Sequence, residues 1–243
     1  MPFAHFALAL SIAVIAHRGE HLRNPENTLP AFREAIALGA DYFELDVRTS
    51  SNGVLVLSHD ATVDRRTNGK GKVAEMTFEE LRKLDAGGGA KIPTFDEALE
   101  LAHGKIGIYV DCKQVAAKQL VDAIAKRSMD AAVVIYGSPR LLKEIQTLNP
   151  KLKVMPEANN AETARRLIED LHPKVIAFDA RDFQPDVIKL VRDAGAEIYV
   201  DRLGVADTPR LWQDAIDRGA AGIQTDHPGE LVDYLKKKGY KQD

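Results

Sequence analysis

The sequence has little cysteine, no strong excess of either charge and no basic run long enough to follow a nucleic-acid backbone. Its single cysteine, Cys112, excludes an internal disulfide framework and is typical of a reducing compartment. The formal net charge of −3 is too close to zero to indicate a nucleic-acid partner. The short cluster Lys236–Lys238 is better explained as the basic last turn of a helix.

Only one apolar run, residues 3–16, could be mistaken for an export signal or a membrane segment. It lacks a preceding basic region and a cleavage site that would leave the next strand intact. It is also too short to span a bilayer once Val14–His17 is assigned to a strand. We therefore expect residues 1–11 to be an extension packed against the bottom of the fold, and a cytoplasmic protein with no stable membrane span. Export, with this run as the remnant of a signal, is the alternative.

Apolar runs typical of strands alternate with amphipathic stretches typical of helices along all 243 residues. The expected strands are residues 14–17, 42–47, 106–111, 132–137, 152–156, 175–179, 197–201 and 222–226. Most are nearly continuous apolar runs, as parallel strands covered on both faces require. Eight β/α units without a break predict an α/β fold, a (β/α)8 TIM barrel forming one catalytic domain over residues 1–243. An open, doubly wound sheet is the alternative, and the count of eight decides against it.

One segment interrupts this alternation. Residues 60–93 are rich in turn-forming residues and contain a short helical stretch at Phe78–Lys83. They follow what looks like a hairpin in the second unit. The segment is therefore expected to be a small insertion rather than a second domain.

Polar residues recur where the expected strands end. They are His17, Glu44, Asp46, Asp111, Glu157, Asp179, Asp201 and Asp226. In barrels of this type the active site lies at the C-terminal ends of the strands. These side chains are therefore expected to surround one cavity.

The residue types at these positions indicate phosphate-ester chemistry. Glu44 and Asp46 are two apart in a strand and so point to the same face, where they repel unless a cation lies between them. With Asp111 they offer oxygen ligands for a hard divalent cation such as Mg²⁺ or Ca²⁺. His17 and His59 are candidates for an acid–base pair, and Arg18 for a clamp on a phosphate oxygen.

Three longer motifs carry a family resemblance. IAHRG, the segment NPENTLPAFREAIALGADYFELDVRTSSNGVLVLSHD and the late GAAGIQTDHPGEL are similar to the glycerophosphodiester phosphodiesterase family. The resemblance implies a (β/α)8 barrel whose catalytic centre contains His17, Arg18, Glu44, Asp46 and His59. It also implies that the insertion caps the substrate site.

Two positions depart from the family pattern. The family places a glutamate and a lysine in an E-x-K pattern on the third strand, where this chain has Asp111 and Lys113. Because aspartate is shorter than glutamate, the preferred metal does not follow from the family pattern. Lys113 matches the lysine of that pattern and is a candidate substrate-binding residue. A late strand usually ends with an aromatic and a small polar residue, but here it carries Tyr199 and Asp201. Because of this change, the residues that bind the alcohol do not follow from the family pattern.

The predicted function is metal-dependent hydrolysis of a small-molecule glycerophosphodiester to an alcohol and sn-glycerol 3-phosphate. The alternatives are a phospholipase D-like phosphodiesterase acting on lysophospholipid or sphingolipid, and a phosphate-ester binding protein without catalysis. Neither the head-group alcohol nor the oligomeric state follows from the sequence.

Several site residues also have simpler interpretations. Asp111 could cap the next helix, and Arg18 could pair with Glu44. Pro25–Thr28 is interpreted mainly as a helix start, with Glu26 and Asn27 as possible pocket residues. Asp226 is expected to orient a loop or a neighbouring base.

Overall fold

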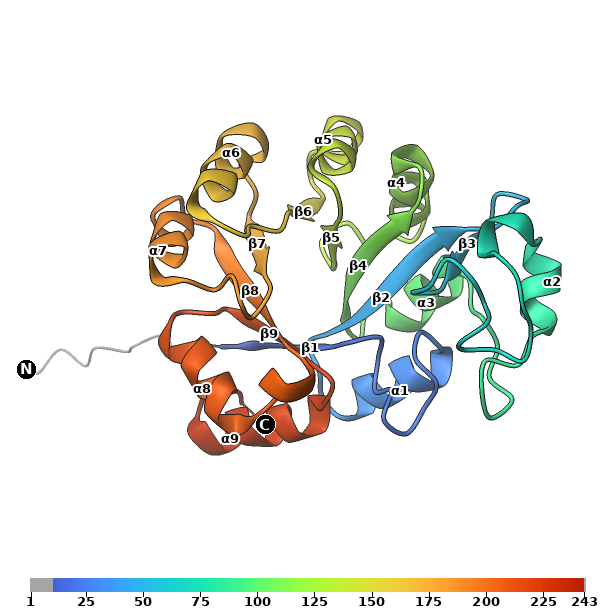
Figure 1. Ribbon diagram of the computed structural model, residues 1–243, viewed down its shortest axis with the longest axis horizontal. Coiled ribbons are helices and arrows are strands. Elements are labelled where there is room, and N and C mark those ends of the chain that lie inside the picture. Colours follow the sequence, from blue (N-terminus) through green and yellow to red (C-terminus); the bar gives the residue numbers. More distant parts are fainter. Residues whose placement is uncertain (1–10, 243) are drawn as a thin grey trace, which may run out of the picture.

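The computed structural model describes residues 11–242 as a barrel of parallel strands inside a layer of helices (Figure 1). The strands are β1 (Ala13–Ala16), β2 (Tyr42–Thr49), β4 (Gly107–Gln114), β5 (Val133–Tyr136), β6 (Lys153–Met155), β7 (Val175–Phe178), β8 (Glu197–Arg202) and β9 (Gly222–Thr225). Their spatial order is β6-β5-β4-β2-β1-β9-β8-β7. A parallel bridge between Glu157 and Ala177 brings the two end strands together. The predicted (β/α)8 barrel is confirmed.

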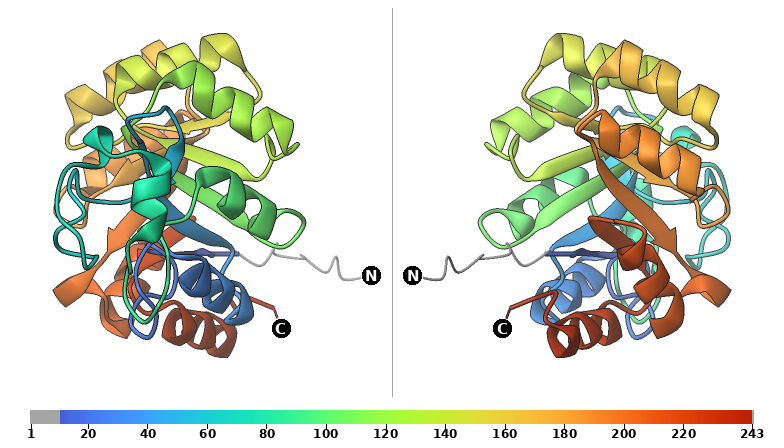
Figure 2. Two further views of the ribbon diagram at one scale, coloured as in Figure 1. Left: turned by 90° about the vertical axis from the view of Figure 1, so that its right-hand side faces the viewer. Right: turned by 90° about the vertical axis from the view of Figure 1, so that its left-hand side faces the viewer.

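Helices lie outside the strands, as the side views show (Figure 2). They are α1 (Leu29–Ala37), α3 (Phe95–Ala102), α4 (Ala117–Lys126), α5 (Pro139–Leu148), α6 (Ala161–Leu171), α7 (Pro185–Asp193), α8 (Pro209–Asp217) and α9 (Pro228–Lys238). Four begin with proline, whose fixed φ and missing N–H suit the first helical position. Each turns apolar side chains inward; the ring of Phe32 on α1, for example, stacks 4.3 Å from that of Phe43 on β2.

The apolar core has two parts, which together leave only one end of the barrel open for polar residues. The larger part fills the layer between strands and helices and includes Phe95 and Trp212. The smaller part, which includes Ile15, Met155 and Tyr199, lies among the strands. Because both parts are buried, polar side chains gather where the strands end.

The segment between β3 and α3 has a small core of its own. β3 (Leu55–Leu57) pairs antiparallel with β2, which is the expected hairpin. The 3-10 helix η1 (Val73–Glu75) and helix α2 (Phe78–Lys83) follow, and α2 has the predicted bounds. Buried Val56, Val63, Val73, Leu81 and Ile92 pack together beneath them.

The predicted packing of residues 1–11 concerns residues outside the described range, apart from Ser11, which is exposed. Within residues 11–242, no helix has the length and apolarity needed to cross a membrane. Cys112 is a free thiol that packs against the larger core.

Candidate active site

All the predicted site residues line one cavity of about 180 Å³ at the C-terminal ends of the strands. They are His17, Arg18, Glu44, Asp46, His59, Asp111 and Lys113. The structure therefore brings together side chains from three barrel strands and from the chain that follows β3. It adds Tyr109, Tyr136 and Gln224, which were not predicted from the sequence. These three lie within or at the end of apolar strands, and nothing in the local sequence marks them as site residues.

A cluster of three carboxylates lies in the wall of the cavity. Oxygen atoms of Glu44, Asp46 and Asp111 are all within 4.8 Å of one another. The register of the sheet explains this, because Asp46 on β2 is the direct partner of Asp111 on β4. Burial and the nearby carboxylates raise the pKa of Glu44 well above its usual range, and burial also raises the pKa of Asp111. Crowded oxygen ligands of this kind suit a hard divalent cation.

Two basic side chains border this cluster. The Lys113 ammonium lies 2.7 Å from an oxygen of Asp111 and 3.3 Å from one of Asp46. The Arg18 guanidinium lies 3.4 Å from Asp46 and 3.2 Å from Glu26. The simpler interpretation of Arg18, in which its guanidinium pairs with Glu44, does not hold, because Glu44 instead accepts a 2.8 Å hydrogen bond from the Arg18 backbone N–H.

The turn after β1 makes this backbone contact possible. Arg18 and Gly19 both have left-handed backbones, with φ of 54° and 79°. A Cβ atom at Gly19 would lie 2.8 Å from the backbone of Ala31. Only glycine fits this close approach, which explains why the histidine–arginine pair is followed by glycine.

The side chain of Asn27 forms two hydrogen bonds with the buried Asp46. Its amide donates to Asp46 Oδ2 at 2.7 Å, and its carbonyl oxygen accepts from the Asp46 backbone N–H at 3.0 Å. Thr28 precedes α1 but does not cap it with its side chain; its hydroxyl donates to the Pro25 carbonyl. The interpretation of this segment mainly as a helix start was therefore incomplete, because it also supports the carboxylate cluster.

His17 forms a hydrogen-bonded pair with Asp226. Their Nδ1 and Oδ1 atoms are 2.7 Å apart, although the residues are 209 positions apart in the chain. Since the ionised carboxylate only accepts, Nδ1 carries the proton and Nε2 is left as the acceptor. Burial lowers the pKa of His17. Burial opposes ionisation of Asp226, but the hydrogen bond and charge of His17, together with the Gly204 backbone N–H and His21, outweigh this and lower its pKa to about 2.

Asp226 is held in turn by Asp207. The Asp207 carboxylate accepts from the Asp226 backbone N–H at 2.6 Å and from the Thr225 hydroxyl at 2.8 Å. His21 completes the group, with its ring edge-on to that of His17 and its Nδ1 2.7 Å from the His17 carbonyl oxygen. Neither Asp207 nor His21 was predicted, because each acts on the site through a neighbour.

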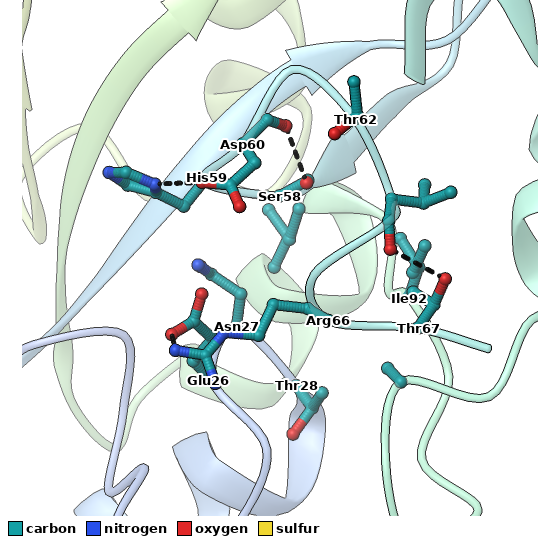
Figure 3. Close-up of a pocket in the computed structure, with 13 residues that line it drawn as sticks. Glu26, Asn27, Thr28, Ser58, His59, Asp60, Thr62, Arg66, Thr67 and Ile92 are labelled. Atoms are coloured by element: carbon teal, nitrogen blue, oxygen red, sulfur yellow. Dashed lines mark hydrogen bonds and ion pairs between the residues drawn. The ribbon is translucent and has the colours of Figure 1, made fainter. Parts of the chain in front are cut away.

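His59 lines both the cavity and a neighbouring pocket beside the segment that follows β3, and Figure 3 shows this neighbouring pocket. Its Nδ1 lies 2.8 Å from Asp60 Oδ1. Asp60 also accepts from Arg65, while Arg48 donates to the His59 carbonyl oxygen at 2.7 Å. These contacts hold both the ring and the backbone of His59. Arg65 and Arg66 reach across to Glu26 at 3.0 and 2.6 Å.

The family model of glycerophosphoryl diester phosphodiesterases matches residues 17–230, a span that includes the whole carboxylate cluster and both histidines. This chain belongs to that family. A glycerophosphodiester phosphodiesterase of Caldanaerobacter subterraneus is 34% identical over 250 residues, covering 93% of this chain and 98% of the relative. One of Bacillus altitudinis is 43% identical over 235 residues, covering 90% and 96%.

A solved structure agrees with these sequence matches. The crystal structure of glycerophosphodiester phosphodiesterase from Agrobacterium tumefaciens has a TM-score of 0.81 and 31% identity, covering 90% of this chain and 98% of that one. The predicted family and the assignment to phosphoric diester hydrolases are confirmed.

In this family member, the wall across the cavity from β1 and β2 is acidic. Glu157, Asp179 and Asp201 follow or end β6, β7 and β8 and line the cavity. Asp179 pairs with Arg181 at 3.1 Å, and Glu157 accepts a hydrogen bond from the Tyr136 hydroxyl. Burial, with Glu157 and Asp179 as the nearest charges, raises the pKa of Asp201 to about 7.

Proposed function

We propose that this protein hydrolyses glycerophosphodiesters to an alcohol and sn-glycerol 3-phosphate, using a divalent cation. The observation that carries the proposal is the buried cluster of Glu44, Asp46 and Asp111 in the same cavity as two histidines and an arginine. A phosphodiester is anionic and inert, so its cleavage needs charge neutralisation and proton transfer. The cavity supplies groups for both.

The cation is proposed to be Mg²⁺ or Ca²⁺, held by Glu44, Asp46 and Asp111. When bound, it supplies Lewis-acid stabilisation of the negative charge on a phosphate oxygen. The raised pKa of Glu44 supports this assignment, because it reflects a buried carboxylate that no neighbouring basic group fully compensates. Arg18 and Lys113 are proposed to bind the remaining phosphate oxygens, since both line the cavity beside the cluster.

The proton transfers are assigned to the two histidines. His17 Nε2 accepts a proton from the nucleophile, which is water or a neighbouring glycerol hydroxyl, while Asp226 keeps Nδ1 protonated. His59 donates a proton to the oxygen of the leaving alcohol. Asp226 is thus a positioning residue for the base, rather than a residue that orients only a loop.

The organisation as one catalytic domain over residues 1–243 stays a prediction. We further propose that residues 60–93 act as an insertion that caps the substrate. Support comes from Arg65 and Arg66, which tie this segment to buried Glu26, and from His59, which borders it and the cavity.

A lipid substrate would call for a broad apolar rim around the cavity. Among residues 11–242, the exposed large apolar side chains are only Leu22, Leu148 and Val205. Single exposed apolar residues are normal on a soluble surface. The structure thus supports a small polar substrate over lysophospholipid or sphingolipid.

The test is release of glycerol 3-phosphate from glycerophosphocholine and glycerophosphoethanolamine, first with EDTA and then with Mg²⁺, Ca²⁺ or Mn²⁺ restored. Release that depends on the metal is expected, and the rates rank the cations. Release unaffected by EDTA would remove the cation from the mechanism. Turnover of lysophospholipid alone, or binding without turnover under every metal, would replace the proposal with one of the alternatives.

A further inference from the structure

One carboxylate in the cavity wall lacks a basic partner. Asp201 lies on β8 and lines the cavity, but its carboxylate makes no hydrogen bond or ion pair with any residue between 11 and 242. The largest charge effects on it come from carboxylates, those of Glu157 and Asp179 above all, whereas the neighbouring Arg202 guanidinium, which pairs with Asp214, acts on it more weakly. Its raised pKa agrees with this absence of compensation. A ligand that brought a positive charge to this wall would relieve the repulsion.

An unpartnered hydroxyl from β4 also lines the cavity, and Asp201 acts on it from the opposite strand β8. Tyr109 on β4 is only 5% exposed, and its hydroxyl has no hydrogen-bond partner in the described part of the chain. It lines the cavity and is close enough for Asp201 to raise its pKa, after the larger effect of burial. Its oxygen is not among the fully enclosed atoms of the described side chains that lack a partner, so the hydroxyl is accessible from the cavity. It is therefore available to a bound molecule.

Two aromatic rings lie beside these carboxylates. The rings of Tyr109 and Tyr136 have centroids 6.0 Å apart and are tilted by 54°. The Tyr136 hydroxyl donates to Glu157, which places a carboxylate at the edge of the second ring. Aromatic faces combined with carboxylates attract ammonium groups, including quaternary ones that cannot donate hydrogen bonds.

The basic groups of the cavity are engaged elsewhere. Lys113 lies against Asp111 and Asp46, and Arg18 lies against Asp46 and Glu26. Arg181 pairs with Asp179 and acts on Asp182 and Glu157 only at longer range. The wall is thus suited to a positive charge and unsuited to a further anion.

Resting on the proposed function, we propose that this protein selects glycerophosphodiesters whose alcohol is cationic, such as choline or ethanolamine. The ammonium group lies against Tyr109 and Tyr136, with Glu157 and Asp201 as its counter-charges. Glycerol phosphate then lies toward the carboxylate cluster on β2 and β4.

The first test compares kcat/KM for glycerophosphocholine and glycerophosphoglycerol, which share the glycerol phosphate but differ in the charge of the alcohol. The wild-type protein should prefer glycerophosphocholine. Asp201→Asn should lower kcat/KM for glycerophosphocholine about tenfold and leave that for glycerophosphoglycerol within about twofold. The matched control is Asp186→Asn, which removes a carboxylate at an exposed position of α7 outside the cavity and should leave kcat/KM for both substrates unchanged. Equal losses on both substrates in Asp201→Asn would overturn the proposal.

The second test does not depend on turnover. Binding of choline is measured by calorimetry in the presence of Mg²⁺ and compared with its uncharged isostere 3,3-dimethylbutan-1-ol. Choline should bind more tightly, and Asp201→Asn should remove the difference. Equal affinities, or choline binding that appears only when Mg²⁺ is withdrawn, would contradict the assigned site. If no diester is hydrolysed but choline still binds selectively, the proposed function fails and this inference stands.

Discussion

The two halves of the cavity wall differ in how their charges are compensated. In the half built on β1, β2 and β4, charged side chains pair closely, such as Lys113 with Asp111 or His17 with Asp226, and Glu44 accepts a hydrogen bond from the Arg18 backbone. In the half built on β6 to β8, Asp201 has no such partner among the described residues. The first half is held rigidly by its own contacts, as a catalytic centre requires. The second half leaves the negative charge of Asp201 available to a positively charged ligand.

Backbone contacts reinforce the difference. In the first half, backbone N–H groups of Arg18 and Asp46 take part in hydrogen bonds with Glu44 and Asn27. These bonds place the side chains relative to the strands themselves. We therefore expect substitutions in the first half to reduce turnover of every substrate, and substitutions in the second half to change selectivity.

The largest effect is expected from His17→Ala. Loss of the proposed base should lower kcat by about 10²- to 10⁴-fold for all diesters, irrespective of the alcohol. Steady-state kinetics on glycerophosphocholine and glycerophosphoglycerol test this. His103→Ala, at an exposed position outside the cavity, is the control. Near-native turnover of the His17 variant would refute its role as base.

Asp226→Asn should lower kcat by on the order of 10²-fold, because the His17 tautomer is no longer held. The carboxylate of Asp226 raises the pKa of His17 against the larger effect of burial. Its removal should lower that pKa further, so the acidic limb of the kcat/KM profile should move to lower pH. A purely structural loss would reduce activity without moving this limb, and a pH–rate series separates the two outcomes.

Asn27→Ala should weaken the affinity for the activating cation by about 10- to 100-fold, because Asp46 loses two hydrogen bonds that orient it. Activity measured across a Mg²⁺ titration gives the apparent affinity. Asn159→Ala, an exposed position beyond β6, should leave it unchanged. An unaltered Mg²⁺ dependence in Asn27→Ala would mean that the carboxylate cluster holds its geometry without this support.

The smallest effect is expected in the acidic half. Arg181→Ala removes an exposed partner of Asp179 and should leave the melting temperature nearly unchanged, because exposed ion pairs contribute little to stability. The freed carboxylate should increase the preference for glycerophosphocholine over glycerophosphoglycerol by about twofold. A decreased preference would mean that Arg181 itself contacts the alcohol.

The sequence alone determined much of the fold, including eight strands, their helices and the short helix Phe78–Lys83. Continuous apolar runs and amphipathic periodicity are local, so they can be read without knowing which strands are neighbours. The ends of those strands, together with the recurring motifs, also identified His17, Glu44 and Asp46 as site residues.

Only the tertiary structure decided how these residues are paired. The register of β2 against β4 sets Asp111 beside Asp46, and barrel closure brings Asp226 to His17 across 209 positions. Tyr109 and Asp207 became visible as site residues only through such contacts. Partners, burial and the compensation of charge arise between segments distant in the chain, and they exist only once the strands have assembled around a common cavity.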